Sequence, residues 1–200
     1  MVMSMGKWIG VLVSAICTSL VCPLALSADY QQLFPQLEKS GFFSEGAKNP
    51  KRVMYVFFDA NCYYCNLTWK ALAPYEKAGL QVRWIPVAYQ KDSSTGRAAA
   101  ILEAPNPALA LRENELGYRP GSYDGGIKPL ERARPSSLKT LQGNLDLMKK
   151  FGAPGTPVVI WKYPDGKIGF RNAVPRLSEL PGITGLPAQK NEDPDLAEFR

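Results

Sequence analysis

Two cysteines, Cys62 and Cys65, offer the clearest chemistry in this sequence. They flank Tyr63 and Tyr64 in the stretch FFDANCYYCNLTWK, directly after a short apolar run. Two thiols at this spacing can supply half of a metal site, close a structural disulfide, or exchange disulfides with other molecules. The rest of the sequence has to decide among these three kinds of site.

The chain contains no histidine. This absence excludes Cys-His nucleophilic catalysis, Ser-His-Asp hydrolysis and zinc sites of the Cys₂His₂ type. A c-type haem site needs a histidine directly after the second cysteine, and Asn66 stands there instead. Two thiolates alone hold a metal only if another molecule adds ligands, so we expect no metal and no cofactor.

The first 28 residues have the pattern of a cleavable signal peptide. One early positive charge, Lys7, precedes an uncharged apolar run from Trp8 to Leu26, and small residues follow this run. Polar residues and a proline interrupt the run, which therefore falls short of the ~20 unbroken apolar residues that a membrane-spanning helix needs. We expect the segment to be removed after export to a compartment where disulfides persist.

Removal of the signal peptide would leave a single pair of cysteines, because Cys17 and Cys22 lie in the removed segment. About 170 residues would remain, which suffices for one domain with a sizeable core. The formal net charge of +6 is spread along the chain in small groups such as Lys149-Lys150. This spacing indicates a solvated surface, and we expect no nucleic-acid partner.

A predicted strand and a predicted helix surround the cysteine pair. Residues 53–58, VMYVFF, form a continuous apolar run of strand length, which is typical of a strand buried on both faces. A turn at residues 59–61 then leads into a helix expected over residues 62–78, with Asn61 as its N-cap. Pro74 is expected to kink or interrupt this helix.

The first cysteine then lies at the N-terminus of a helix. Unpaired backbone N–H groups and the helix dipole favour a thiolate there, and in motifs of this kind the thiol pKa ranges from ~3.5 to ~7. Cys62 is therefore the expected nucleophile. Cys65 lies one turn further on the same face, close enough to form a disulfide with Cys62 or to resolve a mixed disulfide formed there.

The other elements are predicted from apolar periodicity and from the positions of glycine and proline. A short amphipathic helix precedes the strand, and a second strand follows the cysteine-bearing helix. Two further helices then enclose a surface segment with one irregular helix. A β-hairpin, a short helix and a loose tail complete the chain. The expected ranges are 29–41 for the first helix, 80–89 for the second strand, 93–104, 108–116 and 136–152 for the later helices, and 157–161 and 168–172 for the hairpin.

A strand, a turn and a Cys-x-x-Cys pair that opens a helix form a specific combination. With it the sequence resembles the catalytic domain of the periplasmic DsbG/DsbC thiol:disulfide interchange proteins. The resemblance rests on MYVFFDANCYYCNLTWKALAPY, RAAAILEAPNPA and LMKKFGAPGTPVVIW, and YQQLFPQLEKSGFF is similar to the linker helix that precedes that domain. It covers roughly residues 30–175.

The resemblance implies an α/β protein with the thioredoxin fold, in which a helical insertion separates the Cys-x-x-Cys βαβ part from a β-hairpin headed by a cis-proline. It also implies an order of segments along the chain. These are a signal peptide at 1–28, a linker helix and loop at 29–50, a thioredoxin-like catalytic domain at 51–185 and a flexible tail at 186–200.

The resemblance further implies a second half of the site at Thr156 and Pro157. Proteins of this fold place a cis-proline beside the cysteine pair, and the backbone of the preceding residue pairs with an extended substrate strand. Tyr63 and Tyr64 lie in the exposed first turn of the helix and are expected to contact substrate, whereas Trp69 is expected in the core.

Three features depart from that family. It carries a proline or glycine where Tyr63 stands, so its redox potential does not transfer to this chain. Its N-terminal dimerisation domain is expected to be missing, which implies a monomer and favours oxidoreductase over isomerase activity. The proline-broken segment RLSELPGITGLP stands where the family has a regular final helix.

The sequence also lacks an acidic residue that is common in thioredoxins. Thioredoxins often keep a buried carboxylate six residues before the first cysteine, where this chain has Val56. Proton transfer from the resolving thiol then falls to water or to another acid, and Asp59 and Glu76 are the candidates considered. Turn preferences favour a different role for Asp59, namely accepting hydrogen bonds from backbone N–H groups of the turn.

Two functions remain open at this point. The first is a thiol:disulfide oxidoreductase that acts through Cys62-Cys65 and a mixed disulfide on cysteines of periplasmic proteins, with a membrane thiol oxidase or reductase recycling the pair. The second is a non-catalytic binding or chaperone module in which the pair is a structural disulfide. A bridge that closes so short a loop removes little chain entropy, which favours the first function. The motifs do not determine the direction of electron transfer.

Overall fold

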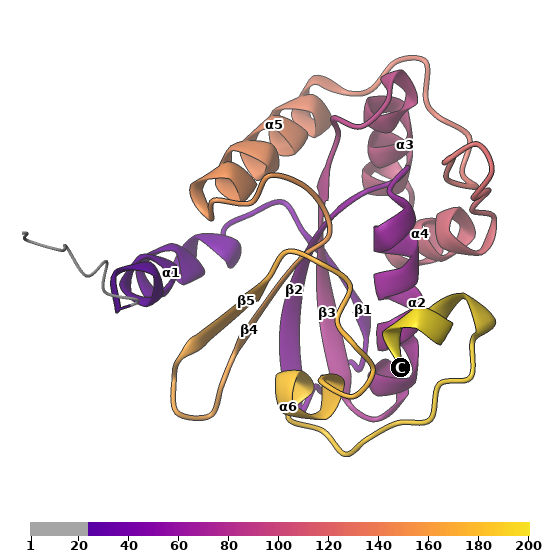
Figure 1. Cartoon of the computed structure of the whole chain (residues 1–200). Helices are drawn as coiled ribbons and strands as arrows, with labels where there is room; N and C mark the ends of the chain where they lie inside the picture. Colours follow the sequence, from indigo (N-terminus) through magenta and orange to yellow (C-terminus); the bar gives the residue numbers. More distant parts are fainter. Residues whose placement is uncertain (1–23) are drawn as a thin grey trace, which may run out of the picture.

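A computed structural model describes the chain from Leu24 to Arg200, with side chains from Tyr30 onward. The predicted signal peptide lies outside the described residues except for residues 24–28, which begin the first helix. Figure 1 shows a central sheet with helices on both sides. None of the described helices is long and apolar enough to cross a membrane.

The sheet has five strands in the order β1-β3-β2-β4-β5. Strands β2 and β3 run parallel, and every other neighbouring pair is antiparallel. The bounds are β1 (Phe43–Gly46), β2 (Arg52–Asp59), β3 (Leu80–Val87), β4 (Val158–Lys162) and β5 (Ile168–Arg171). The strands predicted from the sequence are confirmed, and the short edge strand β1 is an additional one.

Strand β2 lies at the centre of the sheet and is buried on both faces. Met54, Val56 and Phe58 belong to one hydrophobic core. Tyr55 and Phe57, which alternate with them, belong to the other. All five side chains are at most 1% exposed. The two cores explain why the sequence of this strand is a continuous apolar run rather than an alternating one.

Helices cover both faces of this sheet (Figure 1). Helices α2 and α6 contribute to the core on one face, and α1 and α5 to the core on the other. The bounds are α1 (Leu24–Leu37), α2 (Tyr63–Lys77), α3 (Asp92–Glu103), α4 (Pro107–Leu116), α5 (Pro135–Lys150), α6 (Leu180–Thr184) and the 3₁₀ helix η1 (Pro194–Phe199). Helices α3, α4 and α5 lie between β3 and β4, where the helical insertion was expected.

Helix α4 is regular rather than irregular as predicted. The side chain of Asn106 caps it by accepting a hydrogen bond from the backbone N–H of Leu109 at 3.2 Å. Pro107 occupies the first helical position, where a missing N–H costs nothing. Asn106 and Pro107 therefore give this helix a regular start.

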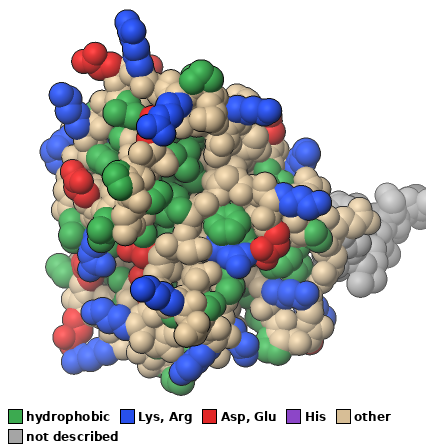
Figure 2. Space-filling view, turned by 180° about the vertical axis from the view of Figure 1, so that it is seen from behind, with side chains coloured by type: hydrophobic (Ala, Val, Ile, Leu, Met, Phe, Trp, Pro, Cys, Tyr) green, Lys and Arg blue, Asp and Glu red, His purple; other side chains and the backbone are tan. Residues whose placement is uncertain are grey.

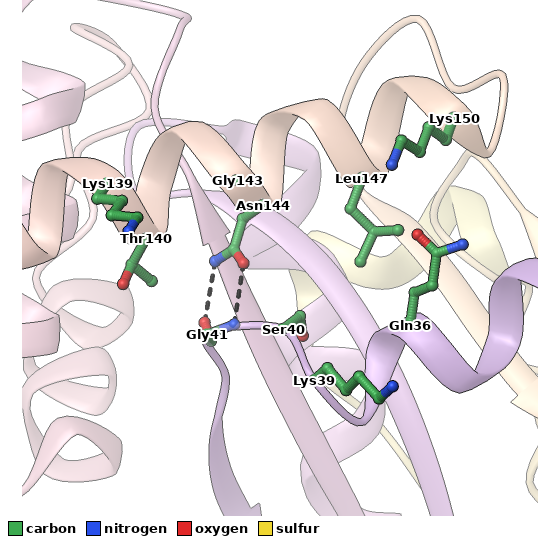
Figure 3. A pocket seen from close by; sticks show the side chains of 10 residues that line it. All are labelled: Gln36, Lys39, Ser40, Gly41, Lys139, Thr140, Gly143, Asn144, Leu147 and Lys150. Atoms are coloured by element: carbon green, nitrogen blue, oxygen red, sulfur yellow. Dashed lines mark hydrogen bonds between the residues drawn. The ribbon is translucent and has the colours of Figure 1, made fainter.

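Asn144 of α5 forms hydrogen bonds with the segment that links α1 to the sheet (Figure 3). Its side chain accepts a hydrogen bond from the Gly41 N–H at 3.1 Å and donates one to the Gly41 carbonyl at 2.9 Å. A Cβ on Gly41 would lie 2.1 Å from Cγ2 of Thr140, so the backbone approaches α5 this closely only because the residue is glycine. A cleft of about 440 Å³ surrounds the contact and shares no lining residue with the cysteine pair.

Helix α2 continues through Pro74 without interruption. Proline has no N–H to donate to the carbonyl four residues earlier, which belongs to Lys70. The side-chain amide of Asn191 donates to this carbonyl instead, at 2.9 Å. A residue near the C-terminus thus satisfies the group that Pro74 leaves without an intrahelical donor, and the interruption considered from the sequence does not occur.

The C-terminal segment packs against α2 and does not form the flexible tail expected for residues 186–200. Leu196 is fully buried and belongs to the same core as the α2 side chains. Asp195 forms an ion pair with Lys70 of α2. The difference arises because one leucine among charged and proline residues gives little sequence signal, yet it fills a place in the core.

Charged side chains are dispersed over the surface. On the face of the described chain that Figure 2 shows, lysine and arginine side chains lie among hydrophobic and acidic ones and form no continuous basic stripe. This arrangement agrees with the solvated surface that the spacing of charges indicates.

We predict that Leu196→Ala lowers the free energy of unfolding by about 2–4 kcal/mol, because a fully buried leucine leaves a cavity when it is truncated. Chemical denaturation monitored by circular dichroism measures this loss. Glu198→Ala, at an exposed position of the same 3₁₀ helix, is the matched control. Equal stability of the two variants would show that the C-terminal segment does not pack against α2.

Candidate active site

Cys62 lies at the junction of β2 and α2 and is the N-cap of the helix. Its sulfur accepts a hydrogen bond from the backbone N–H of Cys65 at 3.2 Å. Asn61, the N-cap expected from the sequence, does not cap the helix. A thiolate at this position receives a backbone donor and the positive end of the helix dipole, as the motif predicts.

Asn61 instead ties the active-site turn to the insertion. Its side-chain amide donates to the hydroxyls of Ser93 and Ser94, both at 3.0 Å, and its side-chain oxygen accepts from the Gly125 N–H at 3.1 Å. The hydroxyl of Tyr118 also donates to the Asn61 carbonyl at 3.0 Å. These partners are distant in the sequence, which explains why local capping preferences misplaced the residue.

Asp59 is fully buried and holds the turn by accepting hydrogen bonds, the role that turn preferences favoured. One carboxylate oxygen accepts from the Asn61 N–H at 2.9 Å and from the Ser94 hydroxyl at 2.8 Å. The other accepts from the backbone N–H groups of Tyr89 and Gln90 at 2.9 and 3.1 Å. One carboxylate therefore joins the active-site turn to the segment that follows β3.

The two thiols have opposite electrostatic environments. Burial by itself raises the pKa of the Cys62 thiol, but several hydrogen bonds together lower it below its ordinary value. The donors are the Cys65 thiol, the side chain of Thr156, the Cys65 backbone and the side chain of Gln90. Burial raises the pKa of Cys65 well above its ordinary value, and the adjacent Cys62 raises it further. Cys62 is thus the better nucleophile at neutral pH.

Thr156 and Pro157 lie beside Cys62, as the resemblance implies. The peptide bond between them is cis. The Cys62 thiol contacts the carbonyl oxygen of Thr156, with 3.4 Å between sulfur and oxygen. The amide of Asn172 donates to the carbonyls of Gly155 and Pro157 at 2.6 and 2.8 Å, and it thereby fixes the loop on which Thr156 lies.

The two tyrosines between the cysteines differ in their surroundings. Tyr63 is partly buried against the core, whereas Tyr64 is 55% exposed. The Tyr63 ring lies near the rings of Tyr118 and Tyr123, with centroid distances of 6.2 and 6.3 Å. An aromatic cluster thus borders the cysteine pair, and two of its rings come from the insertion. Trp69 is buried, as expected.

A family model described as a thioredoxin-like domain matches residues 43–174. The chain belongs to the thioredoxin-like family. Its five-stranded sheet, its Cys-x-x-Cys pair at the start of α2 and its insertion between β3 and β4 confirm the thioredoxin fold expected from the sequence.

The relatives of this thioredoxin-like chain include thiol:disulfide interchange proteins. The protein DsbG of Pseudomonas aeruginosa is 30% identical over 156 residues, which are 78% of this chain and 59% of that protein. DsbG of Escherichia coli is 28% identical over 163 residues, which are 80% of this chain and 58% of that protein. The resemblance seen in the motifs is confirmed, and the chain spans less than two thirds of these relatives.

Solved structures share the fold. A periplasmic thioredoxin-like protein from Salmonella enterica serovar Typhimurium has a TM-score of 0.60 and 23% identity, with 76% of this chain and 93% of that chain covered. The catalytic domain of Proteus mirabilis ScsC has a TM-score of 0.56 and 23% identity, with 76% and 95% covered. At these identities the comparison supports the fold alone.

Sequence reasoning missed a buried carboxyl group, Glu115 of α4, which is 4% exposed. The Asn66 amide, from the residue after Cys65, donates to its carboxylate at 2.9 Å. The Asn114 amide donates to the same carboxylate at 3.1 Å and to the Ala60 carbonyl at 3.0 Å. Because α4 carries several charged residues, no local pattern distinguished this carboxyl as one that turns inward.

Glu76, one of the two acids considered for proton transfer, is in the wrong place. It follows Cys62 by 14 positions on α2, roughly 20 Å along the helix axis at 1.5 Å per residue. There burial and, to a smaller extent, the negative charge of Glu45 raise the pKa of Glu76 to about 8. The acid that interacts electrostatically with Cys62 is Glu115.

We predict that Thr156→Val slows alkylation of Cys62 by iodoacetamide at neutral pH about three- to tenfold and makes the redox potential more negative. The Thr156 side chain helps to lower the pKa of Cys62, so its loss reduces the thiolate fraction and the stability of the reduced form. Thr95→Val, at an exposed position on α3, is the control. An unchanged pH profile of alkylation would contradict this role.

The stability of the protein should fall as the pH rises from about 4.5 to about 8, because Glu115 keeps its proton in the folded state. Burial raises the pKa of this carboxyl from 4.5 to about 8, so the folded state binds the proton that the unfolded chain has released. Glu115→Gln should remove on the order of 2–4 kcal/mol of this loss. Denaturation midpoints at pH 4.5 and pH 8.5 measure it.

The exposed Glu113 on the same helix provides the control for that experiment. Glu113→Gln should leave the difference between the two pH values as it is in the unmodified protein. If Glu115→Gln behaves like Glu113→Gln, the carboxyl of Glu115 does not hold a proton at neutral pH in the folded state.

Proposed function

We propose that this chain is a thiol:disulfide oxidoreductase that acts on cysteines of proteins in the periplasm. The observation that carries the proposal is the unequal pair at the start of α2. Cys62 is the N-cap, and hydrogen bonds support its thiolate, whereas Cys65 lies one turn inward with its thiol held neutral. This division of roles is what nucleophilic attack followed by resolution requires.

In the reducing direction, the Cys62 thiolate attacks one sulfur of a substrate disulfide. A bond forms between Cys62 and that sulfur, the substrate disulfide breaks, and the other substrate sulfur leaves as a thiolate that takes a proton. Cys65 then loses its proton and attacks Cys62, which releases the second substrate thiolate. The substrate gains two electrons and two protons, and the Cys62-Cys65 pair becomes a disulfide. The reverse sequence donates that disulfide to a substrate dithiol.

The alternative is a binding or chaperone module in which Cys62 and Cys65 form a permanent bridge. Two observations favour catalysis over this alternative. A bridge across two intervening residues removes little chain entropy, so it adds little stability. The hydrogen bonds that lower the pKa of the Cys62 thiol stabilise a reactive thiolate, which a structural disulfide does not need.

The remaining parts of the proposal concern partners and location. We infer export to the periplasm by a cleaved signal peptide at residues 1–28, a catalytic domain at residues 51–185 and a monomeric state. Thr156, Pro157, Tyr63 and Tyr64 are proposed to contact protein substrates. A membrane thiol oxidase or reductase is proposed to recycle the pair. The signal-peptide pattern and the similarity to DsbG support the location and the kind of partner, and the site geometry supports the substrate contacts.

We predict that Cys65→Ser accumulates a mixed disulfide between Cys62 and a substrate and lowers turnover at least 100-fold, because the resolving thiol is missing. Mass spectrometry after mixing with a disulfide-containing protein detects the adduct. Cys62→Ser is the matched control and should form little adduct. Equal adduct formation by the two variants would reverse the roles assigned to the cysteines.

The same proposal fails if the Cys62-Cys65 disulfide stays oxidised in glutathione buffers poised below about −300 mV. Such a bridge would be structural, and the binding module would be the better description. A potential between about −270 and about −120 mV supports the oxidoreductase and also shows whether it reduces or oxidises its substrates.

A further inference from the structure

The hydroxyl of Tyr89 is bound to the backbone of the loop beside the cysteines. Tyr89 follows β3, and its oxygen accepts a hydrogen bond from the Thr156 N–H at 2.8 Å. The same oxygen lies 3.2 Å from the hydroxyl of Thr156. The tyrosine side chain is nevertheless on the surface, since the residue is 41% exposed.

This contact occupies a backbone group next to the reactive sulfur. The Thr156 carbonyl lies 3.4 Å from the sulfur of Cys62, so a peptide whose cysteine bonds to Cys62 must pass Thr156. An extended peptide binds an exposed backbone segment mainly through main-chain hydrogen bonds. Thr156 has one N–H to offer such a peptide, and Tyr89 holds it.

The backbone around this contact is held by hydrogen bonds of its own. Asn172 fixes the carbonyls on both sides of Thr156, so the loop itself is held. The buried carboxylate of Asp59 fixes the backbone N–H of Tyr89. Gly155 has no side chain that could crowd the Tyr89 hydroxyl, whereas a Cβ at this position would lie 3.4 Å from it. Hydrogen bonds hold the backbone on both sides, whereas the tyrosine side chain is exposed to solvent.

We propose that Tyr89 is a specificity-determining gate for extended peptide substrates. Its hydroxyl occupies the Thr156 N–H when the site is empty and leaves it when a peptide carbonyl takes that position. The inference rests on the proposed function, because it concerns the substrate of the same cysteine pair. A small disulfide without peptide bonds needs no hydrogen bond from Thr156 and reacts without displacing the tyrosine.

The test compares two substrates of the full-length reduced protein. One is an unstructured peptide with an internal disulfide, and the other is a small aliphatic disulfide. Tyr89→Phe keeps the ring and removes the hydroxyl, so it should raise the second-order rate with the peptide about three- to tenfold and leave the rate with the small disulfide unchanged. Tyr163→Phe, a tyrosine 37% exposed near the β4–β5 turn, should change neither rate.

Amide hydrogen exchange gives a second and direct measurement. The Thr156 amide should exchange more slowly in the unmodified protein than in Tyr89→Phe, because only the former has the hydroxyl as acceptor. The alkylation profile of Cys62 should be the same in both, which separates the gate from a change in thiol reactivity.

Two results with the peptide would overturn the gate. An unchanged ratio of the two rates would show that the hydroxyl does not compete with substrate, and a slower reaction with the peptide would show that it binds substrate directly. In both cases reaction with the small disulfide would persist, so the proposed function would stand. If the unmodified protein reacts with neither disulfide, the proposed function fails and the gate fails with it.

Discussion

The active site depends on one buried carboxylate, that of Asp59. It accepts four hydrogen bonds at the end of the central strand, two from the active-site turn and α3 and two from the segment after β3. A buried carboxylate is stable only when such donors satisfy it, so these elements must be assembled around it. The turn that presents Cys62 and the segment that carries Tyr89 and Gln90 are therefore both hydrogen-bonded to one carboxylate.

The chemistry of the cysteine pair follows from a gradient of burial and hydrogen bonding. Cys62 receives donors from the helix, from Thr156 and from Gln90, so its thiolate is stabilised although the residue is buried. Cys65 has no comparable compensation and keeps its proton. Further inside, Glu115 is held by two asparagine amides, and burial raises its pKa to about 8. Negative charge is therefore favoured at the outer thiol and disfavoured deeper in the site.

The insertion and the C-terminal segment supply hydrogen-bond donors and apolar side chains to the active-site turn and to α2. The insertion supplies two tyrosine rings beside Tyr63 and, through Asn114, a donor for the Ala60 carbonyl. The C-terminal segment supplies Asn191, which donates to the carbonyl that Pro74 leaves free, and the buried Leu196. Both segments thus stabilise the helix that carries the cysteines, one near its first turn and the other along its length.

Features that depend on local patterns could be predicted from the amino-acid sequence. The apolar run of β2, the Cys-x-x-Cys pair at a helix start and the hairpin signal each follow from neighbouring residues. The first two predicted Cys62 as the nucleophile, whereas the thioredoxin fold was implied by the resemblance to the DsbG/DsbC proteins. Contacts between groups far apart in the chain became visible only in the folded structure. Asn61 was misplaced as a cap, Glu115 was missed, and Tyr89 gave no sign that its hydroxyl binds Thr156. The physical reason is that hydrogen bonds between residues far apart in the chain leave no periodic trace in the sequence, whereas burial of a strand or helix face does.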